Sequence, residues 1–148
     1  LKTPVNALIV GKDKNLNSYK KLAKKLKIKA FFTGEQKMTA KFYEASDIFI
    51  LPTHYEPFSN VVLEALSFKN IVFTTAQNGA AEILENRFIM REPNDESILE
   101  LVEQVLNDNE MMRELQEKSF LLSQKFSIEE NASKTLKIIN EVLNLEQK

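Results

Sequence analysis

Two glutamates eight residues apart, Glu56 and Glu64, have a spacing that suits the binding of a polar ligand. Glu56 belongs to a polar and aromatic stretch, 53–60, that connects a short apolar run to a mostly apolar helical segment. A helix start offers free backbone amides and a dipole that favour phosphate. A carboxylate can accept two hydrogen bonds from a cis-diol. Together these groups could bind the phosphate and sugar of a nucleotide.

The helical segment that follows has one narrow polar stripe. On a helical wheel, the apolar residues of 61–66 cover more than half of the circumference, and the stripe consists of Asn60, Glu64 and Ser67. Glu64 lies roughly 7 to 8 Å along the helix from Ser59, at about 1.5 Å per residue. That distance would place its carboxylate at the sugar end of a nucleotide whose phosphates rest at the helix start. Spacing alone leaves open that both glutamates are simply solvated.

The elements that position these residues alternate between strand and helix. Short apolar runs without alternation, typical of strands buried on both faces, occur at 5–10, 30–33, 48–51 and 71–75. Helical patterns follow them at 15–27, 38–45, 61–68 and 80–84. We therefore predict an α/β fold, a Rossmann-like doubly wound parallel sheet formed as one domain over residues 1–148. Ligands of such sheets bind at the carboxyl ends of the strands, which here are followed by 11–15, 34–37, 53–60 and 76–79.

The carboxyl-terminal third continues the pattern. A fifth short strand is predicted near 88–90, and a helix from about Pro93 onward carries the apolar residues of 98–106. The last of two further helices begins with Ser127 and Glu130, which have the spacing of a capping box.

Composition excludes several kinds of chemistry. The chain has no cysteine and one histidine, His54, and the absence of cysteine rules out disulfides, thiolate metal sites and Cys-His nucleophiles within these residues. No clustered pair of carboxylates of the D-x-D type flanks a strand end, so we expect no bound metal. The lysines at the start of the chain lack interleaved aromatic residues, so we expect no nucleic-acid partner; they favour a solvated helix face, with contact to an anionic membrane surface as the alternative. No run is long and apolar enough to span a bilayer, so we expect a cytoplasmic protein, possible peripheral membrane association aside.

Several stretches carry a resemblance to a known family. They are, in chain order, Leu8–Gly11, Phe31–Gly34, Tyr43–Thr53, Glu56–Leu66, Thr74–Ile83 and Phe126–Glu129. Their order and spacing resemble the motifs of glycosyltransferase family 4, the group 1 glycosyl transferases of GT-B fold, including its E-x7-E signature. The resemblance spans nearly the whole chain. It implies the donor-binding, carboxyl-terminal domain of a retaining hexosyltransferase that uses a nucleoside diphosphate sugar, with UDP as the expected base and no cofactor.

The resemblance also implies roles for individual residues. Glu56 would reach the donor sugar as the catalytic residue, and Glu64 would bind the ribose hydroxyls. Further substrate-binding positions are implied around the donor: the backbone amides of Phe58, Ser59 and Asn60 at its diphosphate and sugar, Gly34 and Glu35 beside the base, Gly11 at the first strand end, and the turn of Asn78 and Gly79 near the sugar or phosphate.

Two departures from the family pattern stand out. Ser59 and Asn78 occupy positions where the family usually has glycine. Ser is a good N-cap residue, and Asn tolerates the left-handed conformation better than most residues. The G-R-L-x-x-x-K-G segment, whose Arg and Lys hold the diphosphate in the family, and the amino-terminal acceptor domain are not in this sequence, so we expect a longer enzyme. Lys12 and Lys14 are possible local substitutes for the missing cations.

The resemblance implies an acceptor that is a sugar or a lipid-linked sugar, in the synthesis of a bacterial surface polysaccharide such as lipopolysaccharide or capsule. A GT-B-shaped sugar-nucleotide epimerase and a non-catalytic nucleotide-sugar-binding module are the alternatives.

Overall fold

The strand β4, Ile71–Thr75, lies at the centre of the computed structural model, which describes residues 1–145. All five of its residues are buried, as expected for a strand covered on both faces. It pairs in parallel with β3, Ile48–Leu51, on one edge and with β5, Ile89–Met90, on the other. The absence of apolar and polar alternation in this run therefore predicted its surroundings correctly.

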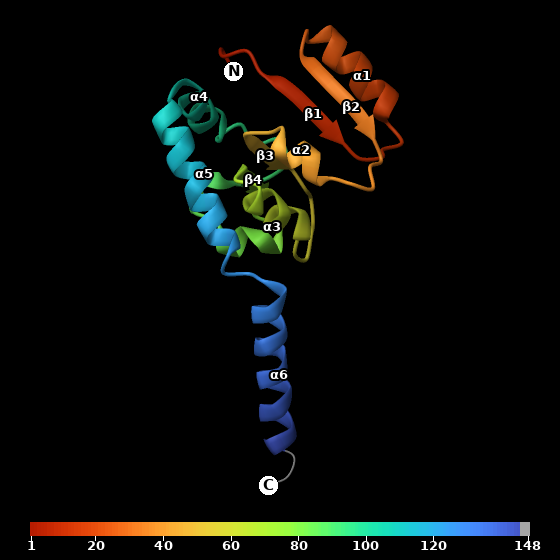
Figure 1. Ribbon diagram of the computed structural model, residues 1–148. Helices are drawn as coiled ribbons and strands as arrows, with labels where there is room; N and C mark the ends of the chain where they lie inside the picture. The colour runs from red at the N-terminus through yellow and green to blue at the C-terminus, as the bar shows by residue number, and fades with distance from the viewer. Residues whose placement is uncertain (146–148) are drawn as a thin grey trace.

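Helices cover both faces of this three-stranded sheet (Figure 1). On one face, α4 (Leu99–Asn107) and α5 (Asn109–Ser123) pack against the odd-numbered residues of β4. On the other face, Val72 packs against α3 (Asn60–Ser67), which buries Val62, Ala65 and Leu66. The predicted polar stripe of α3 is thus confirmed, because Asn60, Glu64 and Ser67 remain exposed.

A separate two-stranded sheet contains β1 (Asn6–Val10) and β2 (Lys29–Gly34), also in parallel. The predicted α/β fold with parallel strands is confirmed, but among residues 1–145 its strands form two sheets where one continuous sheet was predicted. α1 (Leu16–Lys25) has no buried residue, and Phe31 of β2 is 50% exposed. Among residues 1–145, β1 pairs with β2 alone and β3 with β4 alone. In the doubly wound strand order 3-2-1-4-5-6, strand 1 lies between the pair 3-2 and the trio 4-5-6. This order therefore places one strand between a pair and a trio like those seen here.

The shorter elements differ from their predicted extents. α2 covers Ala40–Glu44, because Thr39 takes the N-cap position and its carbonyl accepts the Phe42 amide at 2.9 Å. Met38, the first residue of the predicted helical segment 38–45, precedes α2 and is 77% exposed. The helix predicted over 80–84 is a 3₁₀ helix, η1 (Gly79–Ile83), and a second one, η2 (Asn86–Phe88), precedes β5.

The helix predicted from Pro93 begins later. The carboxylate of Asp95 accepts the backbone N–H groups of Arg91 (2.7 Å) and Ser97 (2.8 Å), which holds this segment in a turn. These bonds lower the pKa of Asp95. The helix α4 therefore starts at Leu99.

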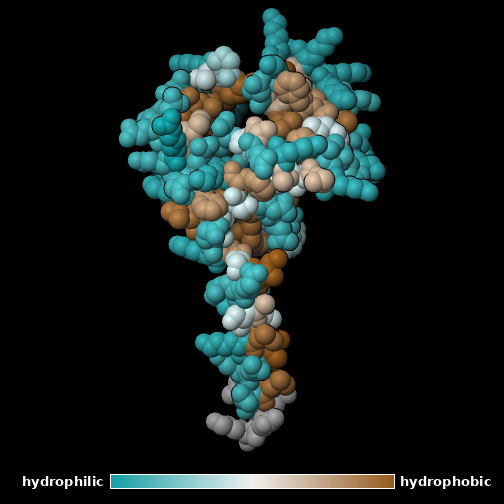
Figure 2. Space-filling view, viewed as in Figure 1, coloured by the Kyte–Doolittle hydropathy of each residue, from teal (hydrophilic) through white to brown (hydrophobic). Residues whose placement is uncertain are grey.

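The last helix, α6 (Ile128–Leu145), extends away from the rest of the molecule (Figure 1). One of the two hydrogen bonds of the predicted capping box is present, because the Glu130 amide donates to the Ser127 hydroxyl at 3.1 Å. An apolar stripe that includes Leu136, Ile139 and Leu143 is exposed along it (Figure 2). The stripe thus takes no part in a local core. Within residues 1–145, no helix combines the length and apolar character needed to cross a lipid bilayer.

Glu103 of α4 ties the start of the chain to the sheet that contains β4. Its carboxylate accepts the Thr3 hydroxyl (2.6 Å) and the backbone N–H groups of Thr3 (2.9 Å) and Lys2 (2.8 Å). The Thr3 hydroxyl is the main reason that the pKa of Glu103 is lowered to about 2, with the two backbone bonds and Asn107 adding to it.

This carboxylate predicts an acid-sensitive contact. Because the folded pKa lies below the ordinary value of 4.5, the contact contributes fully above about pH 4.5 and is lost as the pH falls toward 2. We expect the amide NMR signal of Thr3 to keep its position through pH 4.5 and to shift only at lower pH. A Glu103→Gln variant should show the shifted signal already at neutral pH. A Thr3 titration centred on 4.5 would contradict the assignment.

Candidate functional site

The loop between β3 and α3 is fastened to the turn after β4 by backbone hydrogen bonds. The Glu56 amide donates to the Gln77 carbonyl at 3.1 Å, and the Gly79 amide donates to the Glu56 carbonyl at 2.9 Å. Glu56 and Asn78 thereby form an isolated parallel bridge. The structure thus brings together two of the predicted strand-end loops, 53–60 and 76–79. The Glu56 side chain is half-buried between them and solvent.

Gly79 is the residue that allows this approach. A Cβ atom added to Gly79 would lie 1.8 Å from the Pro57 carbonyl oxygen and 2.9 Å from its carbon. The requirement for glycine is therefore space against the Glu56 loop, whereas the predicted approach of this turn to the donor sugar or phosphate stays a prediction. Any side chain at position 79 must displace the loop or the turn.

Asn78 has its side chain buried beneath the turn, with 1% exposed. Its amide nitrogen donates to the Thr74 hydroxyl (2.9 Å), and its side-chain oxygen accepts the Ala80 amide (3.0 Å). Its φ is −95°, so the left-handed conformation weighed for this position is not used. Both ends of the Asn78 side chain are thus engaged inside the protein.

Two threonines complete this framework, and the sequence analysis assigned them no role. The Thr74 hydroxyl donates to the Leu51 carbonyl at 3.0 Å, and the Thr75 hydroxyl donates to the Thr53 carbonyl at 2.6 Å. Both hydroxyls are buried at the carboxyl end of β4 and hold the end of β3 beside it. The sequence signal for this role was the pair of hydroxyl residues at the end of an otherwise apolar strand.

The start of α3 lies at the same carboxyl edge. Ser59 occupies the N-cap position that was predicted, with φ −91° and ψ 109°, and it is 6% exposed. Its hydroxyl makes no capping hydrogen bond, so the expectation of a side-chain cap is wrong. Phe58 and Asn60, on either side, are exposed. The first turn of α3 therefore has no side-chain cap, and a helix start of this kind favours an anion through its dipole and free amides.

Glu64 is exposed one turn into α3 and has a protein partner on one oxygen. The Tyr43 hydroxyl donates to Glu64 Oε2 at 3.0 Å. Tyr43, on α2, is buried, and burial first, then the hydrogen bond and negative charge of Glu64, raises the pKa of its hydroxyl. The hydroxyl thus stays protonated and donates to the carboxylate. Tyr43 was not predicted as a site residue.

Three further predicted positions lie on the two-stranded sheet. The Gly11 amide donates to the Gly34 carbonyl at 2.9 Å, which joins two of them. Gly34 has φ +69°, a left-handed conformation that glycine adopts without cost, and Glu35 beside it is exposed. Among residues 1–145, no hydrogen bond connects this group to the Glu56 loop. The predicted site therefore consists of two clusters, one on each sheet.

Two other features bear on the chemistry of the site, namely the single histidine and the arrangement of the acidic side chains. His54 is exposed on the 53–60 loop. In the part of the chain described, no three His, Asp or Glu side chains gather in a way that could hold a metal ion.

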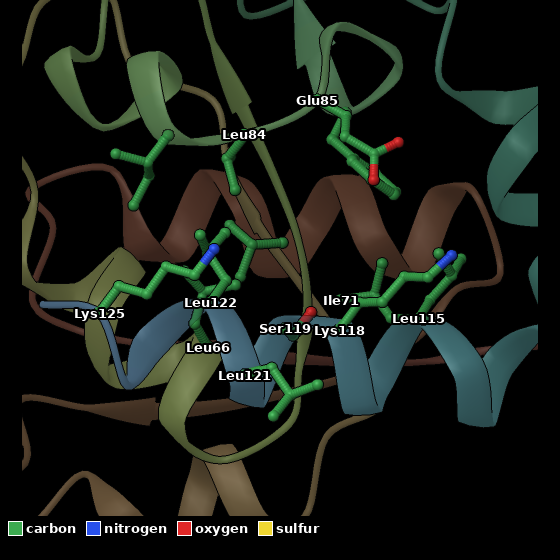
Figure 3. A pocket seen from close by; sticks show the side chains of 13 residues that line it. Leu66, Ile71, Leu84, Glu85, Leu115, Lys118, Ser119, Leu121, Leu122 and Lys125 are labelled. Carbon is green, nitrogen blue, oxygen red and sulfur yellow. The ribbon is translucent and has the colours of Figure 1, made fainter.

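An apolar pocket lies along α5, with Leu115 and Leu122 on one wall and Leu84 on the other (Figure 3). Its floor includes Ile71, at the amino end of β4. Ligands of parallel sheets bind at the opposite, carboxyl end. This pocket shares no residue with the predicted loops and is not the candidate site.

Comparison with known proteins identifies a family. The family model "Glycosyl transferases group 1" matches residues 1–121. An uncharacterized glycosyltransferase of Haemophilus influenzae is 30% identical over 130 residues, which cover 84% of this chain and 37% of that protein. A capsular polysaccharide biosynthesis glycosyltransferase, CapM of Staphylococcus aureus, is 37% identical over 76 residues, covering 49% of this chain and 20% of that protein.

A solved structure shows the same fold. Anabaena HepE in complex with UDP aligns with a TM-score of 0.77 and 19% identity, over 93% of this chain and 41% of HepE. The same protein has been solved with UDP-glucose. The chain spans less than half the length of each of these relatives.

Proposed function

Because the chain belongs to the group 1 glycosyl transferases and has their Rossmann-like GT-B fold, we propose that it is the donor-binding part of a retaining hexosyltransferase. The donor is a nucleoside diphosphate sugar, with UDP as the base. The acceptor is a sugar or lipid-linked sugar in a bacterial surface polysaccharide, such as capsule or lipopolysaccharide. The enzyme works in the cytoplasm, in part at the membrane surface.

One observation carries the proposal. The loop of Glu56 is held against the Asn78–Gly79 turn at the carboxyl edge of the sheet, directly before an uncapped helix start and one turn from Glu64. This arrangement offers a carboxylate for the sugar, backbone amides for the diphosphate and a second carboxylate for the ribose. The complexes of HepE with UDP and UDP-glucose, in the same fold, support a nucleotide sugar as ligand.

Different residues bind the sugar, the diphosphate, the ribose and the base of the donor. Glu56 accepts a hydrogen bond from a sugar hydroxyl, and the amides of Phe58, Ser59 and Asn60 bind the diphosphate and sugar. Glu64 accepts hydrogen bonds from the ribose diol. Gly79 and buried Asn78 act through the backbone of the turn. Gly34, Glu35 and Gly11 form the wall beside the base.

Catalysis follows from positioning and charge stabilisation. The bond from the anomeric carbon to the diphosphate oxygen breaks as negative charge grows on the leaving phosphate. Amides fixed at a helix start stabilise that charge without reorganising. The leaving phosphate accepts the proton of the incoming hydroxyl on the same face, so the configuration is retained. Glu56 holds the sugar so that the acceptor hydroxyl approaches in the correct orientation.

The rest of the site comes from polypeptide outside these 148 residues. The relatives are more than twice as long as the matched region, and the pair β1–β2 and the trio β3–β4–β5 flank the position of one strand in the doubly wound order. We propose that a preceding segment supplies this strand, together with the Arg and Lys that hold the diphosphate. An amino-terminal domain binds the acceptor and covers the exposed stripe of α6.

Calorimetry on the full-length protein tests the donor site. UDP is expected to bind, and Glu64→Ala should weaken its binding roughly tenfold, because hydrogen bonds to a charged group are lost. Glu114→Gln, an exposed glutamate on α5, serves as the matched control and should change nothing. Failure of UDP, GDP and ADP alike to bind would contradict the proposal. With a bound donor, NMR of the product distinguishes a retained anomer from an epimerised sugar nucleotide.

A further inference from the structure

The ring of Tyr43, which projects from α2, packs between Phe49 of β3 and Phe68 at the end of α3. Tyr43 is 8% exposed. It stacks on Phe68 at 5.7 Å between ring centroids and meets Phe49 edge-on at 5.8 Å. A ring confined on two sides has one orientation, so its hydroxyl has a fixed position.

That fixed hydroxyl donates to one oxygen of an exposed, flexible side chain. Glu64 Oε2 accepts the Tyr43 hydroxyl at 3.0 Å. A glutamate on a helix surface samples several rotamers, and ordering it on ligand binding costs conformational entropy. The hydrogen bond from Tyr43 selects one rotamer in advance. Since a carboxylate has about four acceptor sites, Oε1 and part of Oε2 stay available to a ligand.

We propose that Tyr43 is a positioning residue that orients Glu64 for the ribose diol of the donor; this rests on the proposed ribose role of Glu64. Tyr43 does not touch the nucleotide. It raises donor affinity by ordering the carboxylate before the nucleotide arrives.

A purely structural role is the competing explanation, in which Glu64 serves only to satisfy a buried hydroxyl. The two explanations differ in which ligand binds more weakly when the Tyr43 hydroxyl is removed. If Tyr43 acts through Glu64 on the ribose, its effect requires the ribose hydroxyls. If Tyr43 serves only folding, its effect is the same for any nucleotide.

The test measures binding of UDP and of 2′,3′-dideoxy-UDP to the full-length protein by calorimetry. Tyr43→Phe keeps the ring and its packing and removes only the hydroxyl. We expect it to weaken UDP binding about fivefold and to leave binding of the dideoxy nucleotide unchanged, consistent with the loss of one hydrogen bond. Tyr19→Phe, an exposed tyrosine on α1, is the matched control and should change neither.

The double variant Tyr43→Phe, Glu64→Ala completes the experiment. It should bind UDP as weakly as Glu64→Ala and no more weakly, because the hydroxyl then has no carboxylate to orient. Equal effects of Tyr43→Phe on both nucleotides, or no effect on UDP, would overturn the role of Tyr43 while a selective loss with Glu64→Ala upholds the ribose site. If Glu64→Ala itself fails to distinguish the two nucleotides, the ribose role of Glu64 falls and that of Tyr43 falls with it.

Discussion

Replacing Gly79 with alanine is expected to lower kcat/KM of the full-length enzyme by about 100-fold, the effect typical of a displacement of roughly 1 Å at a reacting group. The new Cβ would lie 1.8 Å from the Pro57 carbonyl oxygen, and neither atom is the end of a flexible side chain. Backbone must therefore shift. The atoms that shift include Glu56, whose carbonyl accepts the Gly79 amide at 2.9 Å.

The loss should come from the position of the loop and not from unfolding. Ala81→Gly is the matched control, because it weakens the same short helix η1 without adding an atom toward Pro57. It should keep activity within about twofold. Backbone NMR signals of Glu56 and Phe58 should move in Gly79→Ala and stay in place in Ala81→Gly. An active Gly79→Ala enzyme would mean that the loop is not held in its working position by this turn.

The fold was predictable where the pattern of apolar residues along a segment matches the sides on which that segment packs. β4 and α3 were located within a residue or two because their apolar residues face cores on defined sides. The division of the strands into two sheets was not predictable. Whether β1 adjoins β3 depends on pairing between distant segments, and each strand has the same local pattern with or without that partner.

The site was predictable in its acidic residues and not in their supports. The order of strand, loop and helix placed Glu56 on a loop at the carboxyl edge and Glu64 in the helix that follows, where the structure has them. Tyr43 lies 21 residues from its partner Glu64, and the Thr75 hydroxyl reaches a carbonyl 22 residues away. Such contacts follow from the tertiary fold, and no helical or strand period encodes them. The same reason explains Asn78, whose buried side chain is hydrogen-bonded to Thr74 and Ala80.

Glu56→Gln is expected to have the largest effect on catalysis, a loss of about 10² to 10³ in kcat, comparable to removing one fixed hydrogen-bonding group from a transition state. The variant keeps the size of the side chain and the two backbone bonds to Gln77 and Gly79, so the loop should stay in place. What changes is the negative charge that, in the proposed role, accepts the sugar hydroxyl. The affinity for UDP, which has no sugar beyond its ribose, should be unchanged.

This split between kcat and UDP affinity separates the proposed sugar role from a structural one. If Glu56 only shaped the loop, Glu56→Gln would be nearly silent, and if it served the nucleotide, UDP affinity would fall as it does for Glu64→Ala. Single-turnover rates with UDP-sugar, together with calorimetry of UDP alone, measure the two quantities independently. Among residues 1–145, Glu56 is hydrogen-bonded through its backbone and its side chain is half-buried at the strand ends, which suits the proposed role at the donor sugar. A variant with full kcat would assign the sugar to another residue of the carboxyl edge.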